Sequence, residues 1–179
     1  MCIRDRGYNY VGLTGNPDRQ QQIRERGLVM FRWGHMWPLF VSKKFYADGR
    51  KPEPVDWSDK REWLPMNDKG ERKHNGESLC FSNPEALAWF ADNAANWVLS
   101  QCKGAELVSI WPADRPAVVL CKCPKCRARG LSPTDWYILT HREIKKRLDE
   151  RGWKGRLGWI AYHGTREAPK KIDLPDNLS

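Results

Sequence analysis

Apolar residues along this chain group into short runs that alternate with helical patterns. Three runs predict buried strands, at residues 28–33 (LVMFRW), 107–111 (LVSIW) and 157–162 (LGWIAY). The stretches between and before them predict helices over residues 16–27, 83–104 and 132–152. Each of these helices opens on a capping residue followed by proline and closes near a glycine. Helices and strands alternating in this order favour a parallel sheet with right-handed crossovers.

The connections differ in a way that narrows the fold class. Helix-to-strand links are short and marked by glycine, whereas two strand-to-helix links are long and rich in reactive residues. This asymmetry is typical of a (β/α)8 barrel, whose functional residues gather at the carboxyl ends of the strands. A doubly wound nucleotide-binding sheet would alternate similarly, but no glycine-rich phosphate motif follows a predicted strand. We therefore expect an α/β fold that is part of a (β/α)8 TIM barrel, with about three of its strands and three of its helices.

The domain organisation follows from the same pattern. Residues 7–179 are expected to be a fragment of one barrel domain, the remainder of which is missing from this chain. A long inserted loop at residues 38–81 has no sustained periodicity, and loops of that length are usually functional or disordered. Residues 1–6 (MCIRDR) resemble the adapter read-through that prefixes chains translated from metagenome assemblies, so we expect them to be a sequencing artefact.

Composition adds information about partners. The net charge is +9, but the 31 Lys and Arg are scattered rather than grouped, which argues against nucleic acid as the main partner. The ten Trp are unusual; exposed indoles often stack on sugars or bases, although packing in the core explains them equally well. No apolar run is long enough to span a bilayer, and no signal-peptide pattern opens the chain, so the compartment stays open.

A group of cysteines has the spacing of a metal site. Cys121, Cys123 and Cys126 form a C-x-C-x-x-C motif, and Zn²⁺ takes four such ligands tetrahedrally. Cys80 ends the loop after one strand, and Cys121 lies in the loop after the next, so a parallel barrel would make these loops neighbours. We predict a structural zinc held by these four residues; disulfides or unrelated thiols are the alternatives. Cys102, at a helix end, is expected to be a small buried apolar residue.

Several motifs resemble a known family. The segments RWGHMW, LCFSNPEAL, VSIWPADRP with CKCPKC, SPTDWYILTHREI and LGWIAYHGT follow the order seen in an uncharacterised bacterial domain of unknown function. That family is grouped with α-glucuronidase-like glycoside-hydrolase barrels. The cysteine layout is also similar to barrel β-galactosidases that bind a structural zinc. The resemblance implies a carbohydrate-active barrel that acts on, or binds, a glycan. The chain departs from the family in having Ala113 and Arg115 around Asp114, where Asn and Gly are frequent.

Asp114 is the candidate catalytic residue. It comes directly after the strand at residues 107–111 and is, on this interpretation, the only strand-end carboxylate of the chain. Glycosidases need two carboxylates, so the second would come from strands outside this chain. The alternatives are that Asp114 caps or salt-bridges its loop, or that it hydrogen-bonds a sugar hydroxyl without acid–base work.

Other residues near the predicted strand ends are candidate substrate-binding groups. They are His35, Trp37, Trp111, Arg115, Tyr162 and His163. Two functions remain open at this point. The chain is either part of a glycoside-hydrolase-like barrel with a zinc that braces the active-face loops, or a non-catalytic zinc-stapled binding module for glycan or nucleic acid.

Overall fold

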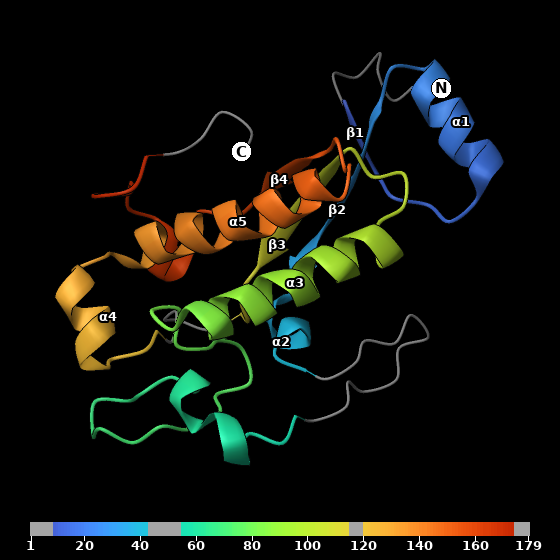
Figure 1. Cartoon of the computed structure of the whole chain (residues 1–179). Coiled ribbons are helices and arrows are strands. Elements are labelled where there is room, and N and C mark those ends of the chain that lie inside the picture. The colour runs from blue at the N-terminus through green and yellow to red at the C-terminus, as the bar shows by residue number, and fades with distance from the viewer. Residues whose placement is uncertain (1–8, 43–54, 115–119, 174–179) are drawn as a thin grey trace.

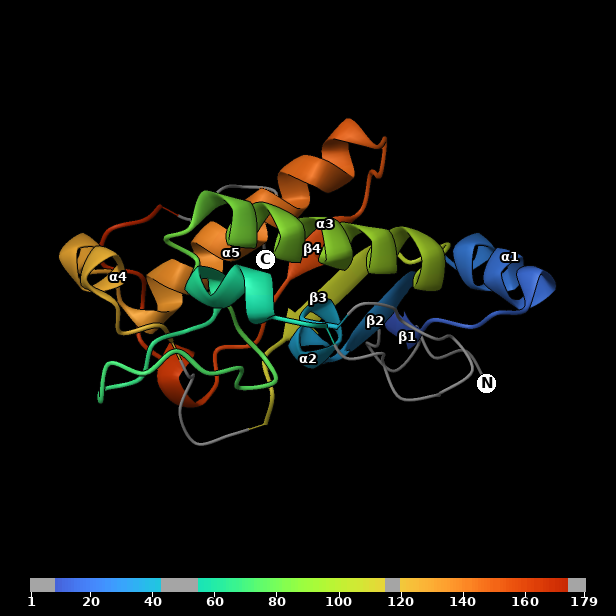
Figure 2. The ribbon, with the colours of Figure 1, turned by 60° about the horizontal axis from the view of Figure 1, so that its bottom comes forward.

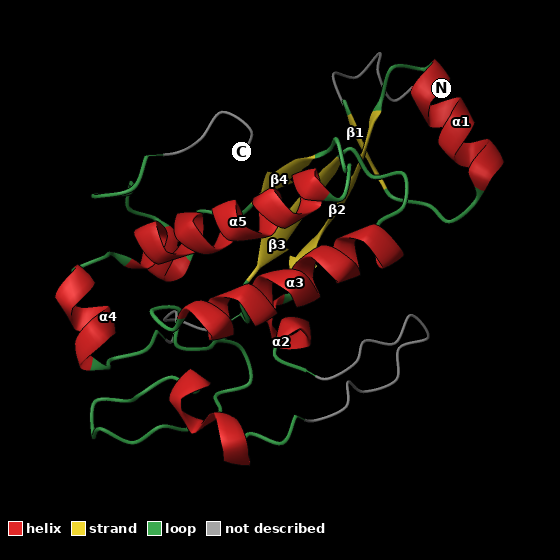
Figure 3. Ribbon diagram, viewed as in Figure 1, coloured by secondary structure: helices red, strands yellow, loops and turns green. Residues whose placement is uncertain are grey.

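A computed structural model describes residues 9–42, 55–114 and 120–173. Its centre is a sheet of four strands: β1 (Tyr10–Gly12), β2 (Val29–His35), β3 (Leu107–Trp111) and β4 (Arg156–Gly158). The strands lie in the order β1-β2-β3-β4, and each neighbouring pair is parallel (Figure 3). The fold is therefore mixed α/β with a parallel sheet in which spatial order follows chain order.

The long helices begin at strong local signals. α1 (Pro17–Glu25) and α3 (Pro84–Gln101) each have proline in the first turn and an asparagine cap whose side chain accepts backbone N–H groups. α5 (Pro133–Glu150) begins with a capping box between Ser132 and Asp135. Shorter helices are α2 (Trp37–Phe40), α4 (Pro124–Arg129) and two 3₁₀ helices, at Ser58–Trp63 and His163–Thr165.

The core lies between the sheet and helices α3 and α5. These two helices run side by side over one face of the sheet (Figures 1 and 2). Asp92 of α3 forms ion pairs with Arg147 of α5 and with Arg151, the C-cap residue of α5. Val108 and Ile110 of β3 are fully buried beneath the helices. The alternate residues of the strand, which include Ser109, point to the opposite face and are only half-buried.

The structure confirms the central predictions and corrects others. The strand at residues 107–111 has the predicted bounds, and the helices over 83–104 and 132–152 are present as α3 and α5. All three expected strands are present, but β1 adds a fourth that was not predicted, and β4 is shorter than the predicted 157–162. Within the described ranges the sheet is open, so a closed barrel is not part of this structure. Residues 1–6 lie outside the described residues.

The expected long loop contains local structure. α2 overlaps the start of residues 38–81 and the 3₁₀ helix Ser58–Trp63 lies within them, while residues 43–54 are outside the described part. Trp63 is buried, and Trp57 packs edge-to-face against Trp89 of α3. Apolar side chains with no regular spacing therefore fix this segment. No helix among the described residues is long and apolar enough to cross a membrane.

A buried carboxylate ties the end of the described chain to α5. Oδ1 of Asp135 accepts the backbone N–H groups of Lys170, Lys171 and Ile172, and Oδ2 accepts the backbone N–H and the side-chain hydroxyl of Ser132. Burial alone would raise the pKa of Asp135, but the hydrogen bonds from Lys171, Ser132 and Lys170 outweigh it and hold that pKa well below its ordinary value. Asp135 is thus a fixed anion that organises two segments.

We predict that Asp135→Asn lowers the free energy of unfolding by about 2–3 kcal/mol, because an amide cannot accept all five hydrogen bonds. The folded-state pKa is depressed, so this contribution is complete above the unfolded carboxyl pKa of about 4 and is lost as the pH falls below it. Urea denaturation at neutral and acidic pH measures both effects. The exposed Asp18→Asn is the control, with an expected change under about 0.5 kcal/mol; equal losses in both variants would contradict the prediction.

Candidate functional site

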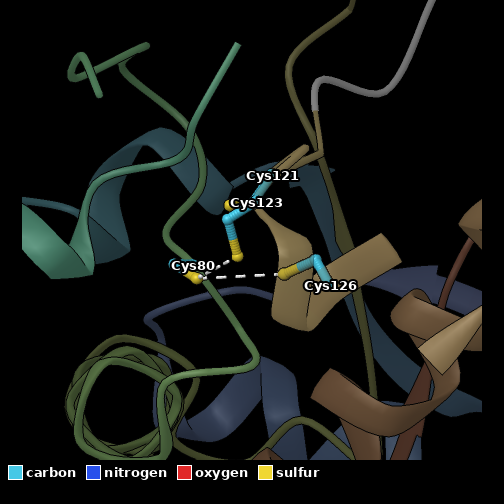
Figure 4. Close-up of side chains that lie close together, drawn as sticks. All are labelled: Cys80, Cys121, Cys123 and Cys126. Atoms are coloured by element: carbon cyan, nitrogen blue, oxygen red, sulfur yellow. Dashed lines mark hydrogen bonds between the residues drawn. The ribbon is translucent and has the colours of Figure 1, made fainter. Parts of the chain in front are cut away.

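Four cysteines from two segments of the chain meet beside the carboxyl end of β3. Cys80 lies just before α3, Cys121 and Cys123 follow β3, and Cys126 lies on α4. All four are buried, and their sulfur atoms lie within 4.8 Å of one another (Figure 4). The predicted grouping of these residues is confirmed, because the loops after successive parallel strands are neighbours at this end of the sheet.

The sulfur spacing fits a single tetrahedral ion. Sγ of Cys80 lies 3.6 Å from Sγ of Cys123 and 3.8 Å from Sγ of Cys126. A zinc ion with thiolates at about 2.3 Å separates its ligands by about 3.8 Å. The cysteines of the described chain are free thiols, so the disulfide alternative does not describe this arrangement. Four buried thiols at these distances could hold one metal ion.

The backbone around the cysteines fixes their positions. Cys123 is the N-cap residue of α4, Pro124 opens that helix, and the left-handed Gly130 ends it. This short helix turns Cys126 back toward Cys123. The N–H of Cys80 donates to the carbonyl of Trp63 at 2.7 Å. The backbone thus positions Cys123 and Cys126 through α4, and Cys80 through its contact with Trp63.

Hydrogen bonds among the thiols polarise the group. The thiol of Cys126, then that of Cys80, and the N–H of Met66 all favour the charged form of Cys121, and its pKa lies well below the ordinary value. The interaction with Cys121 raises the pKa of Cys80 to about 11 and also raises the pKa of Cys126. One thiolate is thus favoured in the metal-free group, and a cation would be needed to ionise the rest.

A second group of side chains lies at the ends of β2 and β3. His35 and Trp111 are paired in the strand register, and their rings meet edge-to-face at 5.3 Å. Trp33, two residues before His35 on the same face of β2, stacks on Trp111 with 4.9 Å between the ring centroids, and it is 51% exposed. Nε1 of Trp111 donates to Ser109, and Nδ1 of His35 contacts the carbonyl of Pro112. These rings lie on the sheet face opposite α3 and α5.

Asp114 and His163 come together from the ends of adjacent strands. Nε2 of His163, after β4, lies 3.9 Å from Oδ1 of Asp114, after β3, and the Asp114 side chain is 65% exposed. His163 is the one non-glycine residue of the described chain with positive φ, at 48°. Thr165 holds this turn, because its hydroxyl donates to Ile160 and Tyr162 and accepts the Tyr162 N–H. Tyr162 is exposed beside the His163 ring.

The remaining predicted residues are placed differently. Trp37 is fully buried, stacked on Tyr137 and packed against Phe81 and Phe90, so it is a core residue in this structure. Arg115 lies outside the described residues. The prediction for Cys102 is confirmed, because it is buried and lies outside the group of four cysteines. His141 is also buried, between the carbonyls of Tyr137 and Ile110.

Sequence reasoning missed a buried carboxylate. Glu77, in the connection between β2 and α3, is 2% exposed. Burial raises the pKa of the Tyr137 phenol well above its ordinary value, and the nearby carboxylate of Glu77 raises it further. Asn75 and Gly76 marked a turn here, and the Asn75 side chain accepts the N–H groups of Glu77 and Ser78. The turn was visible in the sequence, but the burial of Glu77 was not.

Comparison with known families decides the relationship suggested by these motifs. The family described as domain of unknown function DUF4838 matches residues 8–179. The chain belongs to the DUF4838 family. No curated protein matches the sequence.

Similar solved structures include forms of the GH36 alpha-galactosidase AgaA from Geobacillus stearothermophilus. A doubly substituted form with stachyose has 13% identity and a TM-score of 0.39, and a form with 1-deoxygalactonojirimycin has 14% and 0.40. The unsubstituted enzyme has 13% and 0.39. Each comparison covers 78% of this DUF4838 chain and 18% of the galactosidase chain, so the chain spans under a fifth of the length of those proteins.

We predict about one zinc per chain in protein purified without chelator, measured by elemental analysis. Cys80→Ser should reduce the metal content strongly, because it removes one of the four sulfur ligands. Cys102→Ser is the matched control: that thiol is equally buried but lies outside the group, so metal content should not change. Metal-free wild-type protein, or full retention in Cys80→Ser, would contradict the assignment.

Proposed function

We propose that this chain is part of a glycoside-hydrolase-like (β/α)8 barrel that binds a glycan at the carboxyl ends of β2, β3 and β4. The observation that carries the proposal is the Asp114–His163 pair beside the exposed Trp33–Trp111 stack. A carboxylate, two imidazoles and an aromatic surface at adjacent strand ends match the needs of sugar recognition.

The strand order supports the barrel. In a doubly wound sheet the order reverses at a switch point, and helices then cover both faces. Here the order is sequential through the described strands, and α3 and α5 lie on the same face. The opposite face, which carries Trp33, His35 and Trp111, corresponds to the interior of a barrel. The resemblance of the motifs to glycoside-hydrolase-like barrels agrees with this interpretation.

The groups divide into two roles. Trp33 and Trp111 offer an apolar surface on which a pyranose ring stacks, and His35 lies at its edge. Asp114 acts as the general acid or accepts a sugar hydroxyl, with His163 as its neighbour. Trp37 is not included, because it is buried. The four cysteines hold a structural zinc, which braces the loops that follow β2 and β3 without contacting the glycan.

The zinc and glycan roles should separate under mutation. In the full-length gene product, Asp114→Asn should keep zinc content and melting temperature nearly unchanged, because Asp114 is exposed and the amide is nearly isosteric. Turnover of a panel of aryl glycosides and polysaccharides should fall by about 10²-fold or more if Asp114 is the general acid. A much smaller loss indicates a hydroxyl acceptor. Loss of zinc with unchanged turnover per folded molecule would show that Asp114 is a structural brace.

Replacing His163 tests the strained turn. A non-glycine residue in the left-handed region costs about 1–2 kcal/mol. We therefore predict that His163→Gly leaves stability equal or raises it by up to about 1 kcal/mol, while glycan affinity falls. His163→Asn is the second variant, because asparagine adopts the left-handed conformation readily and removes the imidazole without freeing the backbone as glycine does. Thermal melting and titration calorimetry with the best ligand of the panel measure both quantities. A destabilised variant with intact affinity would remove His163 from the glycan site.

The same measurements test the other candidate. Glycan binding without turnover by any member of the panel would leave the chain as a zinc-stapled binding module. Binding to nucleic acid that weakens steeply with salt would assign the net charge of +9 to that partner instead.

A further inference from the structure

Arg72 is tied to the backbone that carries Cys80. Its Nη1 donates to the carbonyls of Leu64 at 2.6 Å and Glu62 at 3.1 Å. The residue between these two is Trp63, whose carbonyl accepts the N–H of Cys80. The guanidinium therefore binds the backbone on both sides of Trp63, the residue that accepts the N–H of Cys80.

A second connection leads from Arg72 to Cys121. The backbone of Arg72 forms an antiparallel bridge with Met66. The N–H of Met66 donates to Sγ of Cys121 at 3.3 Å, and the carbonyl of Met66 accepts the N–H of Lys122 at 2.8 Å. The side chain of Arg72 is thus linked to Cys80 through the backbone around Trp63, and its main chain is linked to Cys121 through Met66.

The positive charge of Arg72 would stabilise the thiolates of a metal-bound group. Four thiolates around one Zn²⁺ leave a net charge of about −2 in a buried site, and nearby cations and N–H donors reduce the cost of that charge. Lys122 and Lys125 adjoin the ligands in sequence but are exposed, whereas Arg72 is half-buried. Burial alone would lower the pKa of Arg72, but interactions with Cys80, and then with Cys121 and Cys123, raise it.

We propose that Arg72 is a positioning residue of the metal centre, which balances the charge of the thiolates and fixes the segment at residues 62–72 across two of the ligands. This inference rests on the metal centre of the proposed function. It makes metal affinity depend on a residue that is not a ligand and that lies in the long connection between β2 and α3.

The test compares Arg72→Gln, Arg72→Lys and the control Lys73→Gln. Lys73 is the next residue, but its side chain is 72% exposed and pairs with Glu71. Zinc affinity is measured by competition with a chromophoric chelator. Thermal melting is recorded with and without zinc, and Co²⁺ replaces zinc to follow the thiolate charge-transfer band.

We expect Arg72→Gln to weaken zinc binding by about 10–100-fold. The loss should be smaller in Arg72→Lys, because lysine keeps the positive charge but not the planar set of N–H donors. Lys73→Gln should bind as wild type does. The melting temperature of Arg72→Gln should fall more with zinc than without it, so that the zinc-dependent gain shrinks; the smaller zinc-free fall reflects the lost hydrogen bonds to Leu64 and Glu62. The cobalt band should persist at saturation, because all four ligands remain.

Two results would overturn the inference alone. They are wild-type zinc affinity in Arg72→Gln, and an equal fall in melting temperature with and without zinc, which would make Arg72 a residue of the fold only. Wild-type protein that binds neither zinc nor cobalt would overturn it together with the metal centre. None of these outcomes bears on Asp114, so the glycan site stands or falls on its own measurement.

Discussion

The position of β3 in the middle of the sheet is the constraint on which the candidate sites depend. It is hydrogen-bonded to β2 on one edge and to β4 on the other. Val108 and Ile110 anchor one face under the helices. A parallel strand held on both edges and one face has a fixed register, because a slip of one residue would exchange its buried and exposed sides. The carboxyl end of β3 therefore has a fixed position, and Asp114 and the cysteine loop both follow that end in the sequence.

The two groups at this end of the sheet differ in their access to water. The four thiols are buried, and their partners are backbone groups and one half-buried guanidinium. Asp114, Trp33 and Tyr162 are exposed. A buried, closed ligand set is typical of structural metal sites, whereas exposed polar and aromatic groups are available to a ligand. The division of roles that we propose for the two groups rests on this contrast.

The sequence predicted those elements whose signals are local. The apolar run at residues 107–111 predicted β3, and the Asn-Pro start predicted α3, because each signal lies within or next to its own element. The same logic could have found α4: Pro124 follows its N-cap and Gly130 ends it, yet we interpreted that stretch as a loop. The cysteine grouping was predictable because parallel topology makes successive loops neighbours.

Features decided by packing between distant segments were not predictable. Trp37 follows the end of β2 closely, which suggested a ligand contact, but Phe81, Phe90 and Tyr137 enclose it from other elements. Glu77 had no sequence signal for its burial. β1 was missed because three residues, one of them glycine, are too few for a periodic pattern, and its pairing with β2 creates it.

The cysteine group also has a consequence for the topology of the unfolded chain. Cys80 and the C-x-C-x-x-C motif enclose α3 and β3, the central helix and strand of the core. A metal ion that binds all four sulfurs would act as a cross-link that closes a loop of roughly 40 residues, and by chain-entropy reasoning such a closure disfavours the unfolded state by about 4 kcal/mol. The ion would then limit how far the centre of the sheet can come apart, well beyond the loops it contacts.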